Sequence, residues 1–239
     1  IVEGAKVRFC GLWVAKRLRN DGKWEYVIDQ NMEVQQLLEE EGYGVDDRVP
    51  RTDSPMPNKH EMYVDTSPAT PADAAWFPKV VGSLQWYSTQ TRWDITQAVS
   101  RVSQQLKKPT VGAVAAVRRI LRYLATHPQR ELVCVRVPGS HYECYSDSDH
   151  AGDRYSDTRS RTGVMVLCNG MPVQWRSNKQ PVTSLSSAQA EIYALSEAVK
   201  DSQKLAWKSE ELGAAKQWPR TIRVDNTSSM SFQRGSNAK

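Results

Sequence analysis

The chain has 239 residues, of which 39% are hydrophobic and 25% are charged, and its formal net charge at pH 7 is +5. This composition excludes a disordered, collagen-like or coiled-coil protein, and no stretch approaches the about 18 apolar residues of a transmembrane helix. At about 150 residues per domain, the length predicts one or two domains. The sequence starts Ile1-Val2-Glu3-Gly4, without an initiator methionine or a signal peptide. We therefore expect a piece of a longer protein that is not secreted.

The first 73 residues predict a hairpin, a helix and a linker, in that order. Residues 9–19 and 24–28 flank Asn20-Asp21-Gly22, a strong hairpin turn signal. Residues 30–41 carry apolar side chains at helical spacing. Residues 48–73 contain five prolines separated by Asp, Ser and Thr, which predicts an extended, mobile linker.

Residues 74–130 predict a helical domain with excess positive charge. Helices are expected over residues 76–88, 95–106 and 110–126. No acidic residue occurs from Ile95 to Arg130, whereas seven residues there are basic: Arg101, Lys107, Lys108, Arg118, Arg119, Arg122 and Arg130. Charge of one sign is compatible with a solvated helix face or with a surface that follows a phosphate backbone. The charge pattern does not choose between them.

From residue 131 the apolar periodicity becomes that of strands. Strands are expected over residues 132–137, 142–149, 164–167, 173–175 and 221–225, with a hairpin that turns at Asn169-Gly170. Ser186 to Gln189 match a capping box, which predicts a long amphipathic helix ending near Gly213. The order of strands and helices predicts an α/β fold with a mixed sheet.

Carboxylates on three predicted elements stand where such a fold places its chemistry. Asp147 and Asp149 end one strand on the same face, Glu191 lies in the first turns of the long helix, and Asp225 ends a later strand. Converging carboxylates repel one another, and Mg²⁺ is the oxygen-seeking cation that suits them. Two such ions about 3.5–4 Å apart can hydrolyse a phosphodiester. Each residue alone is more often a cap or a solvated charge, so the prediction depends on the set.

Five motifs in this part of the chain resemble, in order, those of copia-type retrotransposon ribonuclease H. Residues 145–152 (YSDSDHAG) resemble YSDADWAG, and residues 159–163 (RSRTG) resemble RSTSG. Residues 174–180 (QWRSNKQ) resemble SWKSKKQ, residues 184–194 (SLSSAQAEIYA) resemble ALSSTEAEYIA, and residues 224–228 (VDNTS) resemble DNQSA. An ordered series of this kind is far more specific than any one of its motifs.

The resemblance extends upstream into the copia polymerase. Residues 81–87 (VGSLQWY), 91–95 (TRWDI), 98–101 (AVSR) and 119–124 (RILRYL) resemble segments near the end of that polymerase. It implies the end of a reverse transcriptase palm over residues 1–47, a linker over 48–73, a thumb/connection over 74–130 and a ribonuclease H domain over 131–239. The catalytic YVDD-type motif of the polymerase is absent from the sequence, so we do not expect this piece to polymerise.

By this resemblance, Asp147, Glu191 and Asp225 correspond to three of the family's four metal-binding carboxylates, holding two Mg²⁺ or Mn²⁺ ions. The implied reaction is hydrolysis of the RNA strand of an RNA–DNA hybrid, in the cytoplasm within a virus-like particle or in the nucleus. The implied partners are the hybrid and the remainder of the Pol polyprotein, without a membrane. The residues expected to bind the hybrid are Lys107, Lys108, Arg118, Arg119, Arg122, Arg176, Lys179 and Asn226.

Departures from the family pattern leave alternatives open. His150 replaces the family's Trp, and no acidic residue follows Asp225 in this sequence. Residues 236–239 resemble the lead-in to the family's KHID segment, so we expect a C-terminally truncated domain whose fourth ligand lies beyond Lys239 or is replaced by Asp149. The main alternative is a catalytically inactive, nucleic-acid-binding remnant of the polyprotein. A third interpretation is a purely structural interaction module, in which the basic residues of 95–130 form only a solvated helix face.

Overall fold

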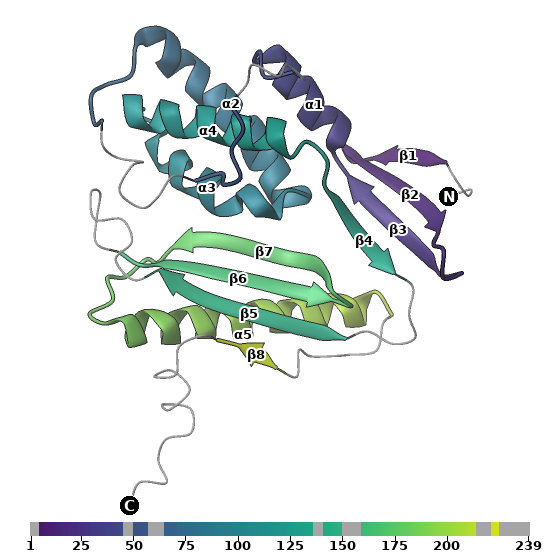
Figure 1. Ribbon diagram of the computed structural model, residues 1–239. Helices are drawn as coiled ribbons and strands as arrows, with labels where there is room; N and C mark the ends of the chain where they lie inside the picture. The colour runs from purple at the N-terminus through teal and green to yellow at the C-terminus, as the bar shows by residue number, and fades with distance from the viewer. Residues whose placement is uncertain are drawn as a thin grey trace, which may run out of the picture. The chain divides into compact units, whose positions relative to one another are not determined.

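The structure is a computed structural model that describes residues 5–44, 50–56, 65–135, 141–149, 159–213 and 221–224. It divides into two compact units, Ile1–Arg136 and Val137–Lys239. Each unit contains a four-stranded sheet, and helices accompany both sheets (Figure 1). The chain is therefore mixed α/β, as the order of predicted elements indicates. No helix in the described ranges is long and apolar enough to cross a membrane.

The sheet of the first unit is antiparallel. Its strands are β1 (Lys6–Phe9), β2 (Leu12–Leu18), β3 (Trp24–Asp29) and β4 (Glu131–Val135), in that spatial order. The predicted turn joins β2 to β3, with Gly22 at a φ of +77°. A second turn with positive φ at Cys10 and Gly11 divides the segment that the sequence predicted as one strand.

Strand β4 completes the first sheet instead of opening the second. Its Leu132 lies opposite Ile28 and its Val133 opposite Val27 of β3. The sequence interpretation assigned this strand to a domain that starts at residue 131, whereas the division between the units falls after Arg136. Strand periodicity identifies a strand but carries no information on its partner.

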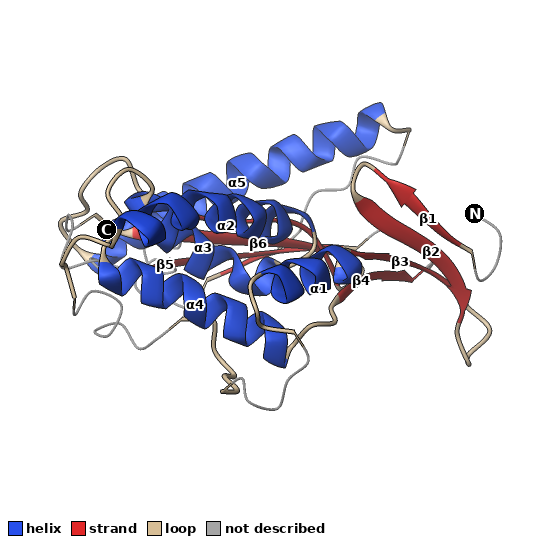
Figure 2. Ribbon diagram, turned by 90° about the horizontal axis from the view of Figure 1, so that it is seen from above, coloured by secondary structure: helices blue, strands red, loops and turns tan. Residues whose placement is uncertain are grey.

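The helices of the first unit surround a single apolar core. They are α1 (Asn31–Glu40), α2 (Pro71–Gln90), α3 (Thr96–Val102) and α4 (Val111–Thr126), with short 3-10 helices at Trp93–Ile95 and Ser103–Gln105. Leu84, Val99 and Leu121 are fully buried in this core. Figure 2 shows the four helices grouped beside one end of the β1–β4 sheet.

Two helix boundaries differ from those predicted, for local reasons. Helix α2 begins before the predicted residue 76 because Thr70 caps it and Pro71 occupies the first turn, where no N–H is needed. The predicted helix over 95–106 is interrupted after α3. There the Ser103 hydroxyl donates to the Val99 carbonyl at 2.7 Å and competes with the helical ladder.

The described parts of the expected linker, residues 50–56 and 65–70, are hydrogen-bonded to the two ends of α4, and residues 71–73 already belong to α2. The Thr52 amide donates to Thr126 Oγ1 at 3.1 Å, and the Ala69 amide donates to the Pro109 carbonyl at 3.0 Å. Pro68 and Thr110 form an isolated bridge. Proline prevents a regular ladder here, but single hydrogen bonds attach the segment to the helical core.

The sheet of the second unit is mixed. Its strands are β5 (Tyr142–Asp149), β6 (Arg161–Cys168), β7 (Met171–Lys179) and β8 (Ile222–Arg223), in the spatial order β7-β6-β5-β8. Only the β5–β8 pair is parallel. The β6–β7 hairpin turns at Asn169 and Gly170, which have φ values of 51° and 82°. Both residues therefore adopt the left-handed conformation that this turn signal predicts.

Helix α5 (Ser187–Glu211) packs along one face of this second sheet. Its Ala198 contacts Cys144 of β5 and Val166 of β6, all fully buried. Ser186 caps the helix by accepting a hydrogen bond from the Gln189 amide, as the capping box predicts. The helix ends at Glu211, followed by Gly213 at a φ of +76°.

Candidate active site at the end of strand β5

Strand β5 carries two of the predicted carboxylates, and its alternation assigns them to one face. Cys144, Ser146 and Ser148 lie on the face that packs against α5, because Cys144 contacts Ala198 there. Asp147 and Asp149 alternate with these residues and so share the other face of the strand. Asp147 is exposed, whereas Ser146 beside it is buried.

The residue opposite Asp147 on the neighbouring strand is a glycine. Gly163 of β6 pairs with Asp147 in the register of the sheet, and a Cβ added to Gly163 would lie 3.9 Å from the Asp147 carbonyl oxygen. Cross-strand partners normally place their Cβ atoms about 4.5–5.5 Å apart on one face. The glycine therefore leaves open space beside the Asp147 side chain.

Glu191 reaches the end of β5 from the second turn of α5. It is 4% exposed, and its Oε1 accepts hydrogen bonds from the Ser148 amide at 3.2 Å and the Ser148 hydroxyl at 2.8 Å. Ser148 stands between the two aspartates. The fold thus brings Glu191 to the same strand end as Asp147 and Asp149, from the α5 side of the strand.

A buried glutamine joins the start of α5 to strand β6. Gln180 donates through Nε2 to Thr162 Oγ1 at 3.1 Å and to the Ala190 carbonyl at 3.0 Å, and its Oε1 accepts from Ser184 at 2.9 Å. Sequence reasoning missed Ser148, Thr162 and Gln180. All three lie inside motifs that resemble the family, but nothing in those motifs shows that their side chains meet.

The described carboxylates do not by themselves complete a metal centre. Within the ranges that the structure describes, no group of three or more His, Cys, Asp or Glu side chains could hold a metal ion. Asp225, Asn226 and His150 lie outside the described residues.

Several basic residues assigned to nucleic acid have structural partners instead. Arg176 on β7 bonds Asp201 and Glu197 of α5 at 2.5 and 2.9 Å. Burial lowers its pKa, but these two carboxylates raise it more, so that the net pKa is above the ordinary value. Arg118 bonds Asp73 at 2.8 Å, and Arg119 Nε donates to the Ser54 carbonyl.

The lysines of the predicted basic surface are more accessible. Lys107 and Lys108 are exposed in the turn before α4, whereas Arg122 is half-buried on α4. Two other arginines of residues 95–130 are buried or ion-paired within the first unit. Arg101 is 2% exposed, and Arg130 lies 3.5 Å from the carboxylate of Asp94. The charge excess seen in the sequence thus combines one buried arginine, Arg101, and several arginines with partners inside the protein with the exposed lysines.

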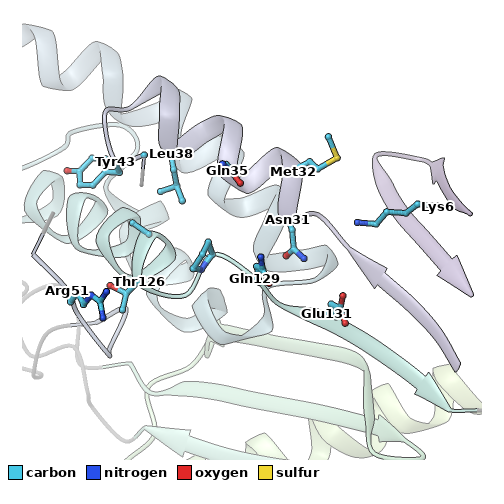
Figure 3. A pocket seen from close by; sticks show the side chains of 13 residues that line it. Lys6, Asn31, Met32, Gln35, Leu38, Tyr43, Arg51, Thr126, Gln129 and Glu131 are labelled. Atoms are coloured by element: carbon cyan, nitrogen blue, oxygen red, sulfur yellow. The ribbon is translucent and has the colours of Figure 1, made fainter. Parts of the chain in front are cut away.

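A separate pocket of about 670 Å³ lies in the first unit (Figure 3). Its lining comes from α1, from β1, from the end of α4 and from the segments that follow α1 and α4. Lys6, Arg51 and Glu131 bring charges of both signs to this pocket.

Comparison with known proteins places the chain in a family. It is 35% identical over 173 residues to the retrovirus-related Pol polyprotein from transposon RE1 of Arabidopsis thaliana. It is 32% identical over 173 residues to the polyprotein from transposon RE2 of the same plant. Each alignment covers 72% of this chain. The chain belongs to the copia-type retrotransposon Pol polyproteins.

The chain corresponds to a small part of such a Pol polyprotein. It spans 11% of the RE1 polyprotein and 12% of the RE2 polyprotein. It is also 38% identical over 121 residues to the secreted RxLR effector protein 161 of Plasmopara viticola, covering 51% of this chain and 84% of that protein. No protein-family model and no solved structure matches the chain.

Proposed function

We propose that the second unit of this Pol segment is a ribonuclease H-like domain that hydrolyses the RNA strand of RNA–DNA hybrids. The observation that carries the proposal is the meeting of Glu191 with Ser148 between Asp147 and Asp149. The described residues of the first four motifs lie on or directly beside β5, β6, β7 and the start of α5. The strand order β7-β6-β5-β8, with α5 between β7 and β8 in the chain, supports a ribonuclease H-like arrangement.

The residues of the strand end have separable tasks in this proposal. Asp147 presents an exposed carboxylate next to the space left by Gly163, where a nucleic-acid backbone can approach. Glu191 is held by two hydrogen bonds from Ser148, so that its carboxylate has a fixed position. The proposed ligands of Mg²⁺ or Mn²⁺ are Asp147, Glu191 and Asp225, and Asp149 is proposed as a further ligand. When bound, such ions activate water and stabilise the leaving oxygen.

The proposed substrate is recognised by shape and by charge. An RNA–DNA hybrid exposes 2′-hydroxyl groups, and these distinguish it from duplex DNA. Exposed Lys107 and Lys108 of the first unit are proposed to contact its phosphates. The remainder of the Pol polyprotein is proposed as the covalent context in which this segment works.

The test is cleavage of a labelled RNA–DNA hybrid in Mg²⁺ or Mn²⁺, with single-stranded RNA and duplex DNA as comparison substrates. We expect cleavage of the hybrid alone, and its loss in Asp147→Asn. The matched control is Glu143→Gln, a carboxylate on the same strand whose partner is Arg223 at 3.2 Å. Equal cleavage by the wild type and Asp147→Asn contradicts the proposal.

A second candidate is a nucleic-acid-binding remnant without catalysis. It is favoured by the described carboxylates, among which no three form a potential metal site. Binding of the hybrid with salt-dependent affinity, but no cleavage in either metal, would select this candidate. Absence of both binding and cleavage would leave only the interaction module.

A further inference from the structure

Gln180 is a buried side chain whose amide nitrogen and carbonyl oxygen both form hydrogen bonds. It follows β7 and is 1% exposed. Its amide group donates to Thr162 Oγ1 and to the Ala190 carbonyl, and its Oε1 accepts from the Ser184 hydroxyl. Two N–H groups and one carbonyl thus each have a partner, which leaves the side chain a single orientation. A buried amide satisfied in this way specifies the geometry of the elements that it joins.

The partners of Gln180 lead to Glu191 along two routes. Ala190 immediately precedes Glu191 on α5, so the bond to its carbonyl holds the helical turn that carries the carboxylate. Thr162 lies opposite Ser148 in the register of β6 and β5. Ser148 in turn donates two hydrogen bonds to Glu191. Gln180 is therefore connected to Glu191 twice, once through Ala190 and once through Thr162 and Ser148.

We infer that Gln180 is a positioning residue that holds the Glu191 carboxylate against Ser148. The effect of Gln180 on catalysis rests on the proposed function, whereas the effect of Gln180 on the position of Glu191 does not. Three motifs of the chain meet at this one amide: residues 159–163 through Thr162, residues 174–180 through Gln180 itself, and residues 184–194 through Ser184 and Ala190. The side chain touches no substrate and acts only through Glu191.

The backbone amide of Ser148 offers a direct reporter of the position of Glu191. The Cys144 amide donates to the Thr221 carbonyl on the β8 side of β5. Ser148 has the same parity along the strand, so its N–H points to that side as well, beyond the two residues that pair with β8. There the Glu191 carboxylate accepts it. Loss of this acceptor exposes the amide to hydrogen exchange.

The experiment measures amide hydrogen exchange at Ser148 by NMR on the full chain. Gln180→Met removes the amide at similar volume, Glu191→Ala gives the rate without an acceptor, and Gln189→Met is the matched control. Gln189 also caps the start of α5, by accepting from the Leu185 amide, but it makes no bond to β6. We expect exchange at Ser148 to accelerate about tenfold or more in Gln180→Met and to approach the Glu191→Ala rate, with no such change in the control.

Two further measurements keep the outcome decisive. If Gln180→Met does not fold, Thr162→Val removes one partner of the amide with the strand shape retained, and it should accelerate exchange where Thr162→Ser does not. In hybrid cleavage, kcat should fall in Gln180→Met with KM unchanged. Unaltered exchange at Ser148 in folded Gln180→Met and Thr162→Val overturns the inference. If exchange at Ser148 accelerates in these variants while the wild type does not cleave the hybrid, the inference on Gln180 is supported and only the proposed function is refuted.

Discussion

Arg92 and Asp94 form a bidentate ion pair inside the first unit. Arg92 Nε lies 3.1 Å from Asp94 Oδ1, and Arg92 Nη2 lies 2.9 Å from Oδ2. The two side chains are 1% and 6% exposed. The Tyr123 hydroxyl also donates to Oδ2, at 3.0 Å, which links the segment after α2 to α4.

Asp94→Asn should destabilise the first unit strongly. It leaves a buried arginine without its countercharge, and breaking such a pair costs about 3–5 kcal/mol. Denaturant unfolding monitored by tryptophan fluorescence measures the change. Asp53→Asn is the control, because its carboxylate is 95% exposed and lies 3.6 Å from His127. An exposed pair contributes about 0–1 kcal/mol. Equal effects of the two substitutions would show that burial does not decide the strength of the Arg92–Asp94 pair.

The same carboxylate should make the first unit sensitive to acid. Burial raises the pKa of Asp94, but hydrogen bonds and charge from Arg92, the charge of Arg130 and the Tyr123 hydroxyl lower it more, so its pKa is below the ordinary value. The unfolded chain therefore binds the proton more readily. The stabilisation is complete above the ordinary pKa of about 3.9 and is lost as the pH falls through the folded value.

Unfolding curves recorded from pH 6 downward, for the wild type and for Asp94→Asn, measure this dependence. The free energy of unfolding should fall more steeply with acid in the wild type, and the difference between the proteins should shrink below about pH 4. Parallel curves for the two proteins would show that Asp94 does not contribute to acid unfolding.

Substitutions of the exposed lysines and of the ion-paired Arg176 should affect hybrid binding differently. Lys107→Gln combined with Lys108→Gln should weaken binding of every hybrid sequence alike and reduce the slope of log affinity against log salt by about 1 for each phosphate that is no longer neutralised. Arg176→Met should leave the affinity of the folded protein unchanged and lower the stability of the second unit, because Asp201 loses its partner. Titrations at several salt concentrations, with thermal unfolding in parallel, measure both. An unchanged salt slope in the lysine variant would exclude these residues from the interface.

Substitutions at Gly163 should separate activity from stability. Alanine fits sterically, since its Cβ would lie 3.9 Å from the Asp147 carbonyl oxygen. Replacing a glycine within a strand should keep or raise stability, by up to about 1 kcal/mol. A side chain there occupies the space beside Asp147, so hybrid cleavage should fall in Gly163→Ala and further in Gly163→Val. Steady-state kinetics and melting temperatures test this, and full activity of Gly163→Val would mean that no substrate approaches there.

Local signals in the sequence predicted much of the fold. The Asn169-Gly170 turn and the Ser186 cap each depend on a few neighbouring residues, and the structure places both where predicted. Strand β5 has the predicted bounds, because its alternation is regular over its whole length. Such features are readable because their energetics are local.

The rest depends on contacts between distant residues. Nothing in Glu131–Val135 indicates that its partner is β3, about a hundred residues earlier in the chain. That Asp147 and Glu191 belong to one site stays a prediction; the structure shows that Glu191 accepts hydrogen bonds from Ser148, the residue after Asp147. The role of Gln180 was not readable, because a glutamine after a strand is as compatible with solvent as with a buried network.

The Glu191 carboxylate also accepts a backbone hydrogen bond at the edge of β5, as a neighbouring strand would. Beyond the two β5 residues that pair with β8, its carboxylate accepts the backbone N–H that a longer β8 would otherwise bind. An exposed strand edge invites pairing with other chains. Loss of this glutamate should therefore leave the Ser148 N–H without its acceptor and make this edge of β5 available for pairing with other chains, so that soluble protein is lost to aggregation.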